Sequence, residues 1–242
     1  MVKPIVAAGT DEQRWTAWSA PGTWERLSLS SSGATPPLVV APHPDDEVLG
    51  VGGLLSMIDG AEVIVVTDGE ASHPGSRVFD SAELAAIRRA ETAAACKLLG
   101  VPRSAVDHLG QPDGAVDEAS LTDALCRRLR PGQWCLTTWR GDGHPDHEAV
   151  GRAAAQACRR TGAVLLEFPI WTWHWAVPDA PEVPWQRARR VDLTEAARAA
   201  KARAINEFPS QILPLGPEPA DAAILPPNVL ARFARPYETV FI

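Results

Sequence analysis

Histidine and carboxylate side chains are concentrated in one short stretch of the chain, residues 39–53, which reads VVAPHPDDEVLGVGG. His43, Asp45, Asp46 and Glu47 follow an apolar, β-branched run that is typical of a strand buried on both faces. His43 and Asp46 are three residues apart where this strand turns into a helix, so their side chains can converge on one point. An imidazole and a carboxylate are both good ligands for Zn²⁺. The spacing therefore indicates two metal ligands, with Asp45 directed elsewhere as a spare base.

A second cluster lies about a hundred residues later, in GDGHPDHEAVG (141–151), again between a predicted strand and a predicted helix. His144 and His147 repeat the three-residue spacing. If the two strands are neighbours, both loops open on the same edge of the sheet. One of these two histidines can then complete a three-ligand site with His43 and Asp46, and the other is available for proton transfer.

Two structural alternatives compete with a metal site. Asp45, Asp46 or Asp142 could cap helices, because acids are favoured at helix N-termini, and for one motif alone this alternative has equal weight. Two such motifs after apolar strands favour the metal site. A phosphate-binding loop is the other alternative, since GVGG follows at 50–53. These glycines come after the acids, which would repel a phosphate at the helix N-terminus, so close packing of the helix on the sheet explains them better.

The predicted elements alternate between strand and helix. Apolar runs predict strands at 37–41, 62–67, 105–110, 134–138 and 163–168, and a last strand in YETVFI at 237–242. Residues 80–100 read as a helix with Asp80 or Ser81 as N-cap, Glu83 in a capping box and Gly100 as its stop. Another helix is expected near 194–207. This order is typical of an α/β fold with a mainly parallel sheet flanked by helices, and with the active site at the carboxyl ends of the strands.

The bulk composition excludes several classes of partner. The chain has 242 residues and a formal net charge of −7, which disfavours nucleic acid because phosphate binding requires a basic face. No apolar run approaches the ~20 residues of a membrane span. Four scattered cysteines and the lack of a signal-peptide pattern predict a reduced, cytoplasmic protein. The sequence leaves the oligomeric state open, a homo-oligomer included.

The region after about residue 170 differs in composition. It is rich in proline, and Trp171, Trp173 and Trp175 are bunched together. Clustered tryptophan can belong to the core or form the wall of a sugar or aromatic site. No linker is long enough to define a second domain, so we expect one domain over 1–242, with a motif-bearing core at about 37–170 and residues 171–242 shaping the substrate rim.

PHPDDEVLGVGG and HPDH resemble, in order and in distance, the two signatures of the LmbE-like or PIG-L-type zinc deacetylases. The resemblance extends over about 37–170 and includes VVTDGEASHPG (65–75) and the Arg-x-x-Glu of IRRAETAAACKLLG (87–100). It implies a Rossmann-like domain that removes N-acetyl groups from glucosamine-containing substrates. It also implies His43, Asp46 and His147 as zinc ligands, Asp45 as general base, and His144 as the residue that steadies the oxyanion and protonates the leaving amine.

Further site residues follow from the same resemblance. Asp146 is placed to hydrogen-bond a histidine and hold it protonated, and its alternative is a helix cap. Arg88 could fork onto sugar hydroxyls and Asp113 could grip the glucosamine ring. Their alternatives are a surface ion pair of Arg88 with Glu91 or Glu83, and a turn role for Asp113 before Gly114. Glu70, His73 and His174 have weaker claims to the site. Some family members have a tyrosine where this chain has Asp142, which leaves the oxyanion contacts open.

The sequence thus predicts a metal-dependent hydrolase of an N-acetylglucosamine-type sugar or its conjugate, acting through metal-activated water, with a small-molecule amino-sugar substrate. Zn²⁺ is the expected cofactor, and Fe²⁺ also suits two histidines and an aspartate. Two alternatives remain: an amidase of the same family that cleaves a larger conjugate amide, and a non-catalytic sugar-binding or metal-binding module. The tryptophans suggest that the sugar carries an apolar or aromatic group, and they single out Trp171 and Trp173 as its contacts.

Overall fold

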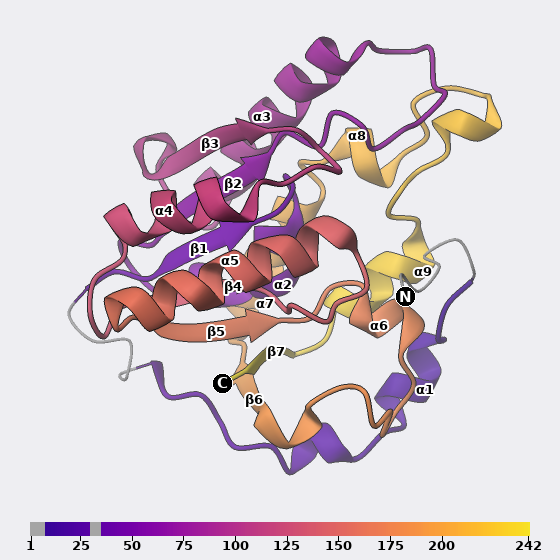
Figure 1. Ribbon diagram of the computed structural model, residues 1–242. Helices are drawn as coiled ribbons and strands as arrows, with labels where there is room; N and C mark the ends of the chain where they lie inside the picture. Colours follow the sequence, from indigo (N-terminus) through magenta and orange to yellow (C-terminus); the bar gives the residue numbers. More distant parts are fainter. Residues whose placement is uncertain (1–7, 30–34) are drawn as a thin grey trace.

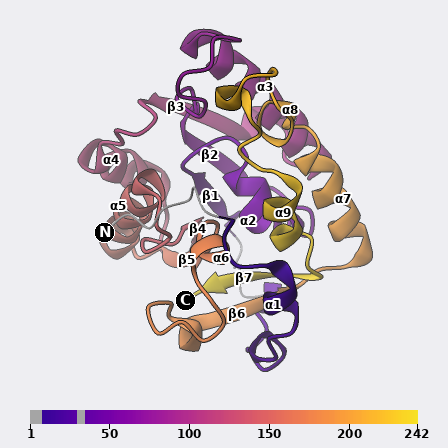
Figure 2. The ribbon, with the colours of Figure 1, turned by 90° about the vertical axis from the view of Figure 1, so that its right-hand side faces the viewer.

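The computed structural model describes residues 8–29 and 35–242, which form a seven-stranded sheet with helices on both faces (Figures 1 and 2). The strand order is β3-β2-β1-β4-β5-β7-β6. The strands are β1 (Leu38–Ala41), β2 (Glu62–Thr67), β3 (Val106–Gln111), β4 (Trp134–Thr138), β5 (Val164–Phe168), β6 (Ala188–Asp192) and β7 (Tyr237–Phe241).

The first five strands are parallel to one another, which confirms the predicted parallel sheet. The sheet is mixed, however, because β7 runs antiparallel to both β5 and β6. Among the described strands, β6 is the one that the hydrophobic pattern missed. Its sequence ARRVD carries two arginines that lie half-buried at the sheet edge, and charged side chains are common on edge strands.

Two layers of helices enclose the sheet (Figure 2). Helices α4 and α5 cover one face, and α2, α3 and α7 cover the other. Successive side chains of β1 point to opposite faces of the sheet, so the strand contributes to both cores. Val39 packs in one core, and Leu38 and Val40 pack in the other. The helices are α1 (Glu12–Thr16), α2 (Asp46–Leu55), α3 (Ser81–Leu98), α4 (Glu118–Arg128), α5 (Pro145–Thr161), α6 (Thr172–Trp175), α7 (Glu195–Ile205), α8 (Pro209–Ile212) and α9 (Pro227–Leu230).

Helix α3 begins and ends as its sequence predicts. Asp80 is the N-cap, its side chain accepts from Glu83 N at 2.8 Å, and Glu83 Oε2 accepts from Asp80 N at 3.0 Å. This reciprocal capping box satisfies two donors that the first turn would otherwise leave open. Gly100 follows the helix with φ +84°, a left-handed conformation that favours glycine.

Helix α2 carries the first acidic motif and packs unusually closely on the sheet. A Cβ on Gly50 would lie 2.2 Å from the ring of Phe168 on β5, so only glycine allows this approach. This contact confirms the packing role for Gly50, the first glycine of the motif. The helix is also broken at Val51, whose φ of −138° and ψ of 20° are not helical.

A buried ion pair occupies the break in α2. Glu238 of β7 accepts from Gly53 N at 2.7 Å and Leu54 N at 2.8 Å, while Lys201 Nζ donates to Leu49 O at 2.7 Å. The two side chains also bind each other, Nζ to Oε1, at 2.7 Å. They therefore bind the backbone groups that have no helical partner at the break. Insertion of side chains into the hydrogen-bond ladder is a recognised cause of helix kinks.

One of the three bunched tryptophans, Trp173, belongs to the core. The rings of Trp15, Trp18, Trp24, Trp173 and Trp185 form one cluster, in which neighbouring centroids lie 4.9–6.0 Å apart. Trp15 Nε1 also donates to the carbonyl of Trp173 at 3.0 Å. Trp173 is thereby committed to packing, and the hypothesis that it contacts substrate is wrong.

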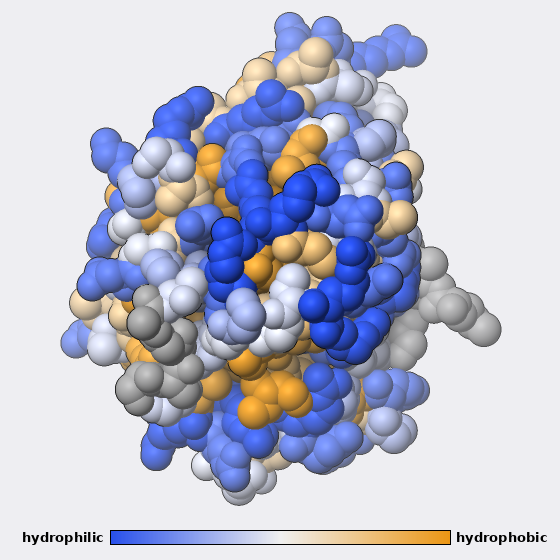
Figure 3. Space-filling model, turned by 60° about the vertical axis from the view of Figure 1, so that its left-hand side comes forward, coloured by the Kyte–Doolittle hydropathy of each residue, from blue (hydrophilic) through white to orange (hydrophobic). Residues whose placement is uncertain are grey.

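The visible surface is mainly polar. On the face shown in Figure 3, hydrophilic residues predominate and hydrophobic ones show as patches among them. Within residues 8–29 and 35–242, none of the helices has both the length and the apolar character needed to cross a membrane.

Candidate functional site

The two histidine motifs meet at the edge of the sheet where the strand order reverses. β1 pairs with β2 on one side and with β4 on the other, so the chain leaves β1 and β4 in opposite directions. His43 lies in the loop after β1, and His144 is the N-cap of α5 after β4. A crevice at the carboxyl ends of such strands is the usual binding site in open α/β sheets. The neighbouring strands bring the motifs together, as the sequence predicts.

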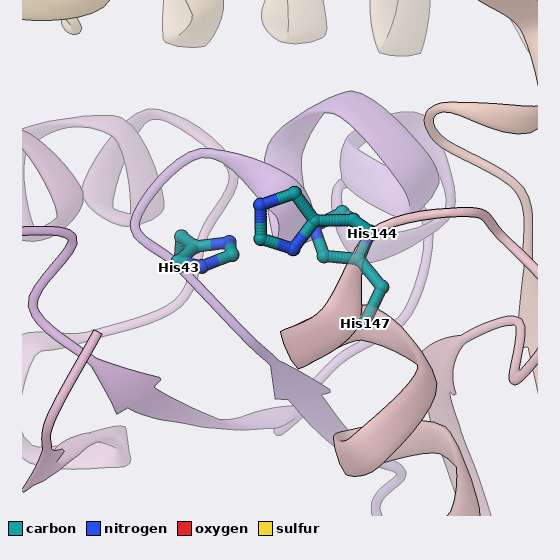
Figure 4. A group of neighbouring side chains, drawn as sticks. All are labelled: His43, His144 and His147. Carbon is teal, nitrogen blue, oxygen red and sulfur yellow. The ribbon is translucent and has the colours of Figure 1, made fainter. Parts of the chain in front are cut away.

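Three imidazoles face one another in this crevice (Figure 4). Each imidazole has one ring nitrogen that could bind a metal ion together with the others. These three nitrogens, from His43, His144 and His147, lie within 4.8 Å of one another. Asp46 Oδ2 lies 3.2 Å from His43 Nδ1 and 3.2 Å from His147 Nε2. The carboxylate therefore stands between an imidazole from each motif.

These contacts fit a bound metal ion. Ligand atoms about 2.0–2.2 Å from one tetrahedral zinc lie about 3.3 Å from each other, close to the two separations at Asp46. His147 Nε2 is buried and makes no hydrogen bond of good geometry to the described residues, as expected of an atom kept for a metal. Burial opposes protonation of His147, but the carboxylates of Asp46 and Asp142 outweigh it and raise its pKa to about 9. The site thus favours a positive charge, which a metal cation would supply in place of the proton.

Asp142 orients His147, a role that the sequence does not reveal. Its carboxylate is fully buried and contacts His147 Nδ1 at 2.8 Å. It also accepts from the backbone N–H groups of Ile170, Trp171 and Thr172, each at 2.9 Å, and from Thr172 Oγ1 at 2.5 Å. Because the Asp142 carboxylate can only accept a hydrogen bond, it keeps the proton of His147 on Nδ1. The lone pair of Nε2 is then available to bind a metal.

We expect Asp142→Asn to weaken metal binding about 10- to 100-fold. The asparagine can present its amide N–H to His147 Nδ1, which moves the imidazole proton to Nε2 and blocks the lone pair there. Competition with a chelator of known affinity would measure the dissociation constant. Thr172→Val is the matched control, because it removes one donor to Asp142 and leaves the contact with His147. Unchanged metal affinity in Asp142→Asn would show that this carboxylate does not set the tautomer.

Asp45 lies beside the predicted ligands and points into the same crevice. It is the N-cap of α2 and has a φ of 112°, which is uncommon for any residue other than glycine. Its Oδ2 accepts from Arg88 Nη2 at 3.0 Å, and its N–H donates to Glu47 Oε2 at 3.1 Å. Burial raises the pKa of Asp45 to about 7, against the opposing charge of Arg88. A carboxyl group with such a pKa can exchange a proton near neutrality.

Arg88 is a buried structural partner of this loop. Its guanidinium donates to Gly69 O at 2.9 Å and Pro44 O at 2.5 Å as well as to Asp45. The surface ion pair with Glu91 or Glu83 that the helix spacing allowed is therefore not its arrangement. Arg88 does line the cavity above the site, but its main contacts hold Asp45 in place.

The second ring nitrogen of His43 faces two further acids. Nε2 lies 3.1 Å from Asp146 Oδ2 and 3.2 Å from Asp113 Oδ1. Asp146 also accepts from Gly114 N at 2.8 Å, and Asp113 accepts from Ala71 N at 2.9 Å. Asp146 thus contacts a histidine, as expected, and that histidine is His43. Both acids brace the loop that carries the first motif.

His144 differs electrostatically from the proton donor that the family resemblance implies. Its Nδ1 accepts from Asp146 N at 3.3 Å, so the side chain caps α5. Burial and the neighbouring His147 and His43 lower its pKa to about 3. His144 is therefore neutral at pH 7 in this arrangement, and a role as acid requires that it gain its proton during the reaction.

A cavity of about 640 Å³ opens above these residues. Besides the predicted residues, its lining includes positions without chemistry-bearing side chains, which the sequence could not single out. These positions are Leu49, Ala71, Pro74, Ile170, Pro219, Ala220, Ala222, Ala223, Ile224 and Leu225. Trp171 and His73 also line the cavity, whereas His174 contacts Arg232 at 2.8 Å and Glu70 accepts from Asp113 N at 2.9 Å.

Comparison with known proteins connects this geometry to a family. Residues 38–158, half of the chain, match the model of the family described as PIG-L: GlcNAc-PI de-N-acetylase. A protein of Bacillus cereus called probable N-acetyl-alpha-D-glucosaminyl L-malate deacetylase 2 is 32% identical over 136 residues, which are 51% of this chain and 60% of the relative. The match thus spans about three fifths of the relative's length.

Solved structures share the fold. The conserved protein TT1542 from Thermus thermophilus is 28% identical, with a TM-score of 0.53 over 72% of this chain and 79% of the other. N,N'-diacetylchitobiose deacetylase from Pyrococcus horikoshii is 22% identical, with a TM-score of 0.57 over 75% of this chain and 73% of the other. At that identity the second likeness concerns the fold alone.

Proposed function

Because the chain belongs to the PIG-L family, we propose that it is a metal-dependent hydrolase that removes the N-acetyl group from an N-acetylglucosamine-type sugar or its conjugate. The observation that carries the proposal is the position of Asp46 Oδ2, 3.2 Å from a nitrogen of His43 and 3.2 Å from one of His147, with Asp45 alongside. A binding module has no need of an additional carboxylate held beside such a ligand set.

We assign the metal to His43, Asp46 and His147. When bound, zinc or ferrous iron would polarise the acetyl carbonyl and lower the pKa of water from 15.7 to about 7. Two of the three ligands are supported by carboxylates, His147 by Asp142 and His43 by Asp113 and Asp146. Such outer contacts fix the direction of each ring and increase its basicity.

The proton transfers are assigned to Asp45 and His144. Asp45 takes the proton from the attacking water, and the Arg88 guanidinium at 3.0 Å keeps its carboxylate turned into the crevice. The ring centroids of His144 and His43 lie 4.9 Å apart. In its neutral form His144 can donate to the developing oxyanion, and it passes to the leaving amine the proton that Asp45 has taken from the water.

The rest of the chain supplies the walls of the substrate site. We propose one domain over 1–242, in which the motif-bearing core at 37–170 supplies the reaction centre and residues 171–242 shape the rim. The cavity lining supports this division, because Trp171, Gln211 and the 219–225 segment come from the second region. Arg88 and Asp113, which also line the cavity, are proposed to contact the sugar.

Acetate release with defined metal content would test the function. The substrates are N-acetylglucosamine and its methyl, phenyl and malate conjugates, the last chosen because the curated relative is named for one, together with donors of bulkier acyl groups. We expect release to vanish when a chelator strips the protein and to return with zinc or anaerobic ferrous iron. Activity that persists in protein free of metal by elemental analysis would refute metal dependence.

The same panel separates the alternatives. Turnover of bulky acyl donors without acetate release would indicate an amidase. Stoichiometric metal with no turnover of any donor would favour a non-catalytic binding module.

A further inference from the structure

We infer that the sugar recognised by this site carries an uncharged, apolar group, which lies between Trp171 and the 219–225 segment. The inference rests on the proposed function and deepens it, because it names the chemical class of the group attached to the sugar. It follows from the division of the cavity into a charged floor and an uncharged rim.

The rim is built from apolar side chains of three separate segments. Leu49 of α2, Ile170 and Trp171 after β5, and Ala220, Ile224 and Leu225 of the C-terminal region all line the cavity. Leu49, Ile170 and Leu225 are buried, whereas Trp171 and Ile224 are half-buried. An apolar group in this position would cover the part of the tryptophan and isoleucine that water now reaches, which is favourable in proportion to the area covered.

Outside the proposed metal site, the described lining of the cavity offers no free cation for an acidic group. Arg88 is the one arginine or lysine of the described chain in its lining, and its guanidinium already donates to Gly69 O, Pro44 O and Asp45. His73 also lines the cavity, but burial and the nearby Arg88 lower its pKa. The floor in contrast contains Asp45, Asp46 and Asp113. Away from the proposed metal ligands, a carboxylate on the substrate would therefore meet no arginine or lysine of the described lining that is not already engaged.

The cavity has room for more than the sugar, and its wall is fixed. Its volume of about 640 Å³ lies within the range of about 300–1,000 Å³ for pockets that bury drug-sized ligands. The backbone of Trp171 is anchored, because its N–H donates to Asp142 Oδ2, the oxygen that also contacts His147 Nδ1. One carboxylate thus sets both a proposed metal ligand and the rim tryptophan, so the rim keeps its distance from the reaction centre.

Three glycosides of one sugar would test the inference. We expect kcat/KM for acetate release from phenyl N-acetylglucosaminide to exceed that from the malate conjugate at least about tenfold, the smallest discrimination typical of one apolar group in a fitted pocket. The methyl glycoside reports the sugar alone. Calorimetric binding of the deacetylated phenyl and malate products to the protein gives the same comparison without turnover.

Two lysine substitutions, one at the rim and one away from it, test whether the rim sets the preference for the phenyl group. Ile224→Lys places a cation at the rim and should lower the phenyl-to-malate ratio at least about tenfold. Val164→Lys places the same charge on an exposed residue at the amino end of β5 and should leave the ratio unchanged, with circular dichroism confirming that both variants are folded.

The possible results are distinguishable. Acetate release from the methyl glycoside with a phenyl-to-malate ratio at or below one would overturn the inference and leave the proposed function standing. An unchanged ratio in Ile224→Lys would also overturn it. No release from any glycoside, with metal bound, would remove the proposed function, and the inference with it.

Discussion

Asp45→Asn is expected to lower the rate of acetate release by about 10²- to 10⁴-fold, the usual contribution of a general base, while the protein keeps its metal. The asparagine has nearly the same shape and can still accept from Arg88, but it cannot take a proton from water. Asparagine is also preferable to alanine here, because it tolerates positive φ better and Asp45 has a φ of 112°. Acetate release and metal content should be measured on the same sample.

The matched control is Asp59→Asn, the same substitution at an exposed residue between α2 and the amino end of β2. It should retain the wild-type rate. If Asp45→Asn released acetate as fast as this control, Asp45 would have no part in the proton transfer. Loss of both metal and activity would instead mean that Asp45 acts mainly by holding the loop of His43 and Asp46.

Glu238→Gln is expected to lower the free energy of unfolding by about 3 to 5 kcal/mol, the cost of leaving one buried charge without its partner. Lys201 would keep its charge in the break of α2 but lose its carboxylate partner, with the carbonyl of Leu49 as its other acceptor. The glutamine also cannot accept from both Gly53 N and Leu54 N as the two carboxylate oxygens do. Urea unfolding would measure the loss.

The companion variant is Lys201→Met, which should cost less. Glu238 would still accept from the two N–H groups that begin the second part of α2, where a negative charge is favoured. The double variant Lys201→Met/Glu238→Gln should be more stable than Glu238→Gln, because no unpaired charge remains. Equal stability of the double variant and Glu238→Gln would contradict a penalty that arises from the unpaired ammonium.

Much of the fold could be predicted because its signals are local. The five parallel strands are short apolar runs between turn-forming residues, and the caps of α3 lie within its own sequence. β6 could not be found in this way, since its stability depends on pairing with β7, a strand that begins only at Tyr237, long after β6 ends at Asp192. The antiparallel insertion of β7 between β5 and β6 likewise leaves no local trace.

The site could be predicted to the extent that its residues are chemically distinctive. Histidines and acids after apolar strands locate the crevice, because parallel strands end at one edge. Asp142 resembles any polar residue before a helix, and only the folded chain brings Ile170, Trp171 and Thr172 to it. Trp171 and Trp173 are equivalent in the sequence, yet one lines the cavity and the other packs on Trp15.

The break in α2 has a consequence for the order in which the protein matures. Helix α2 begins at Asp46 and so follows directly on the first motif, but Gly53 depends on Glu238, made 185 residues later. At about 5–20 residues per second, the ribosome needs on the order of 10 to 40 s to reach that glutamate. Once His147 has been made, 91 residues before Glu238, the nascent chain contains all three proposed metal ligands, while the helix that begins at the second of them still lacks its last support. Metal captured on the ribosome would therefore meet a looser site than metal captured after release.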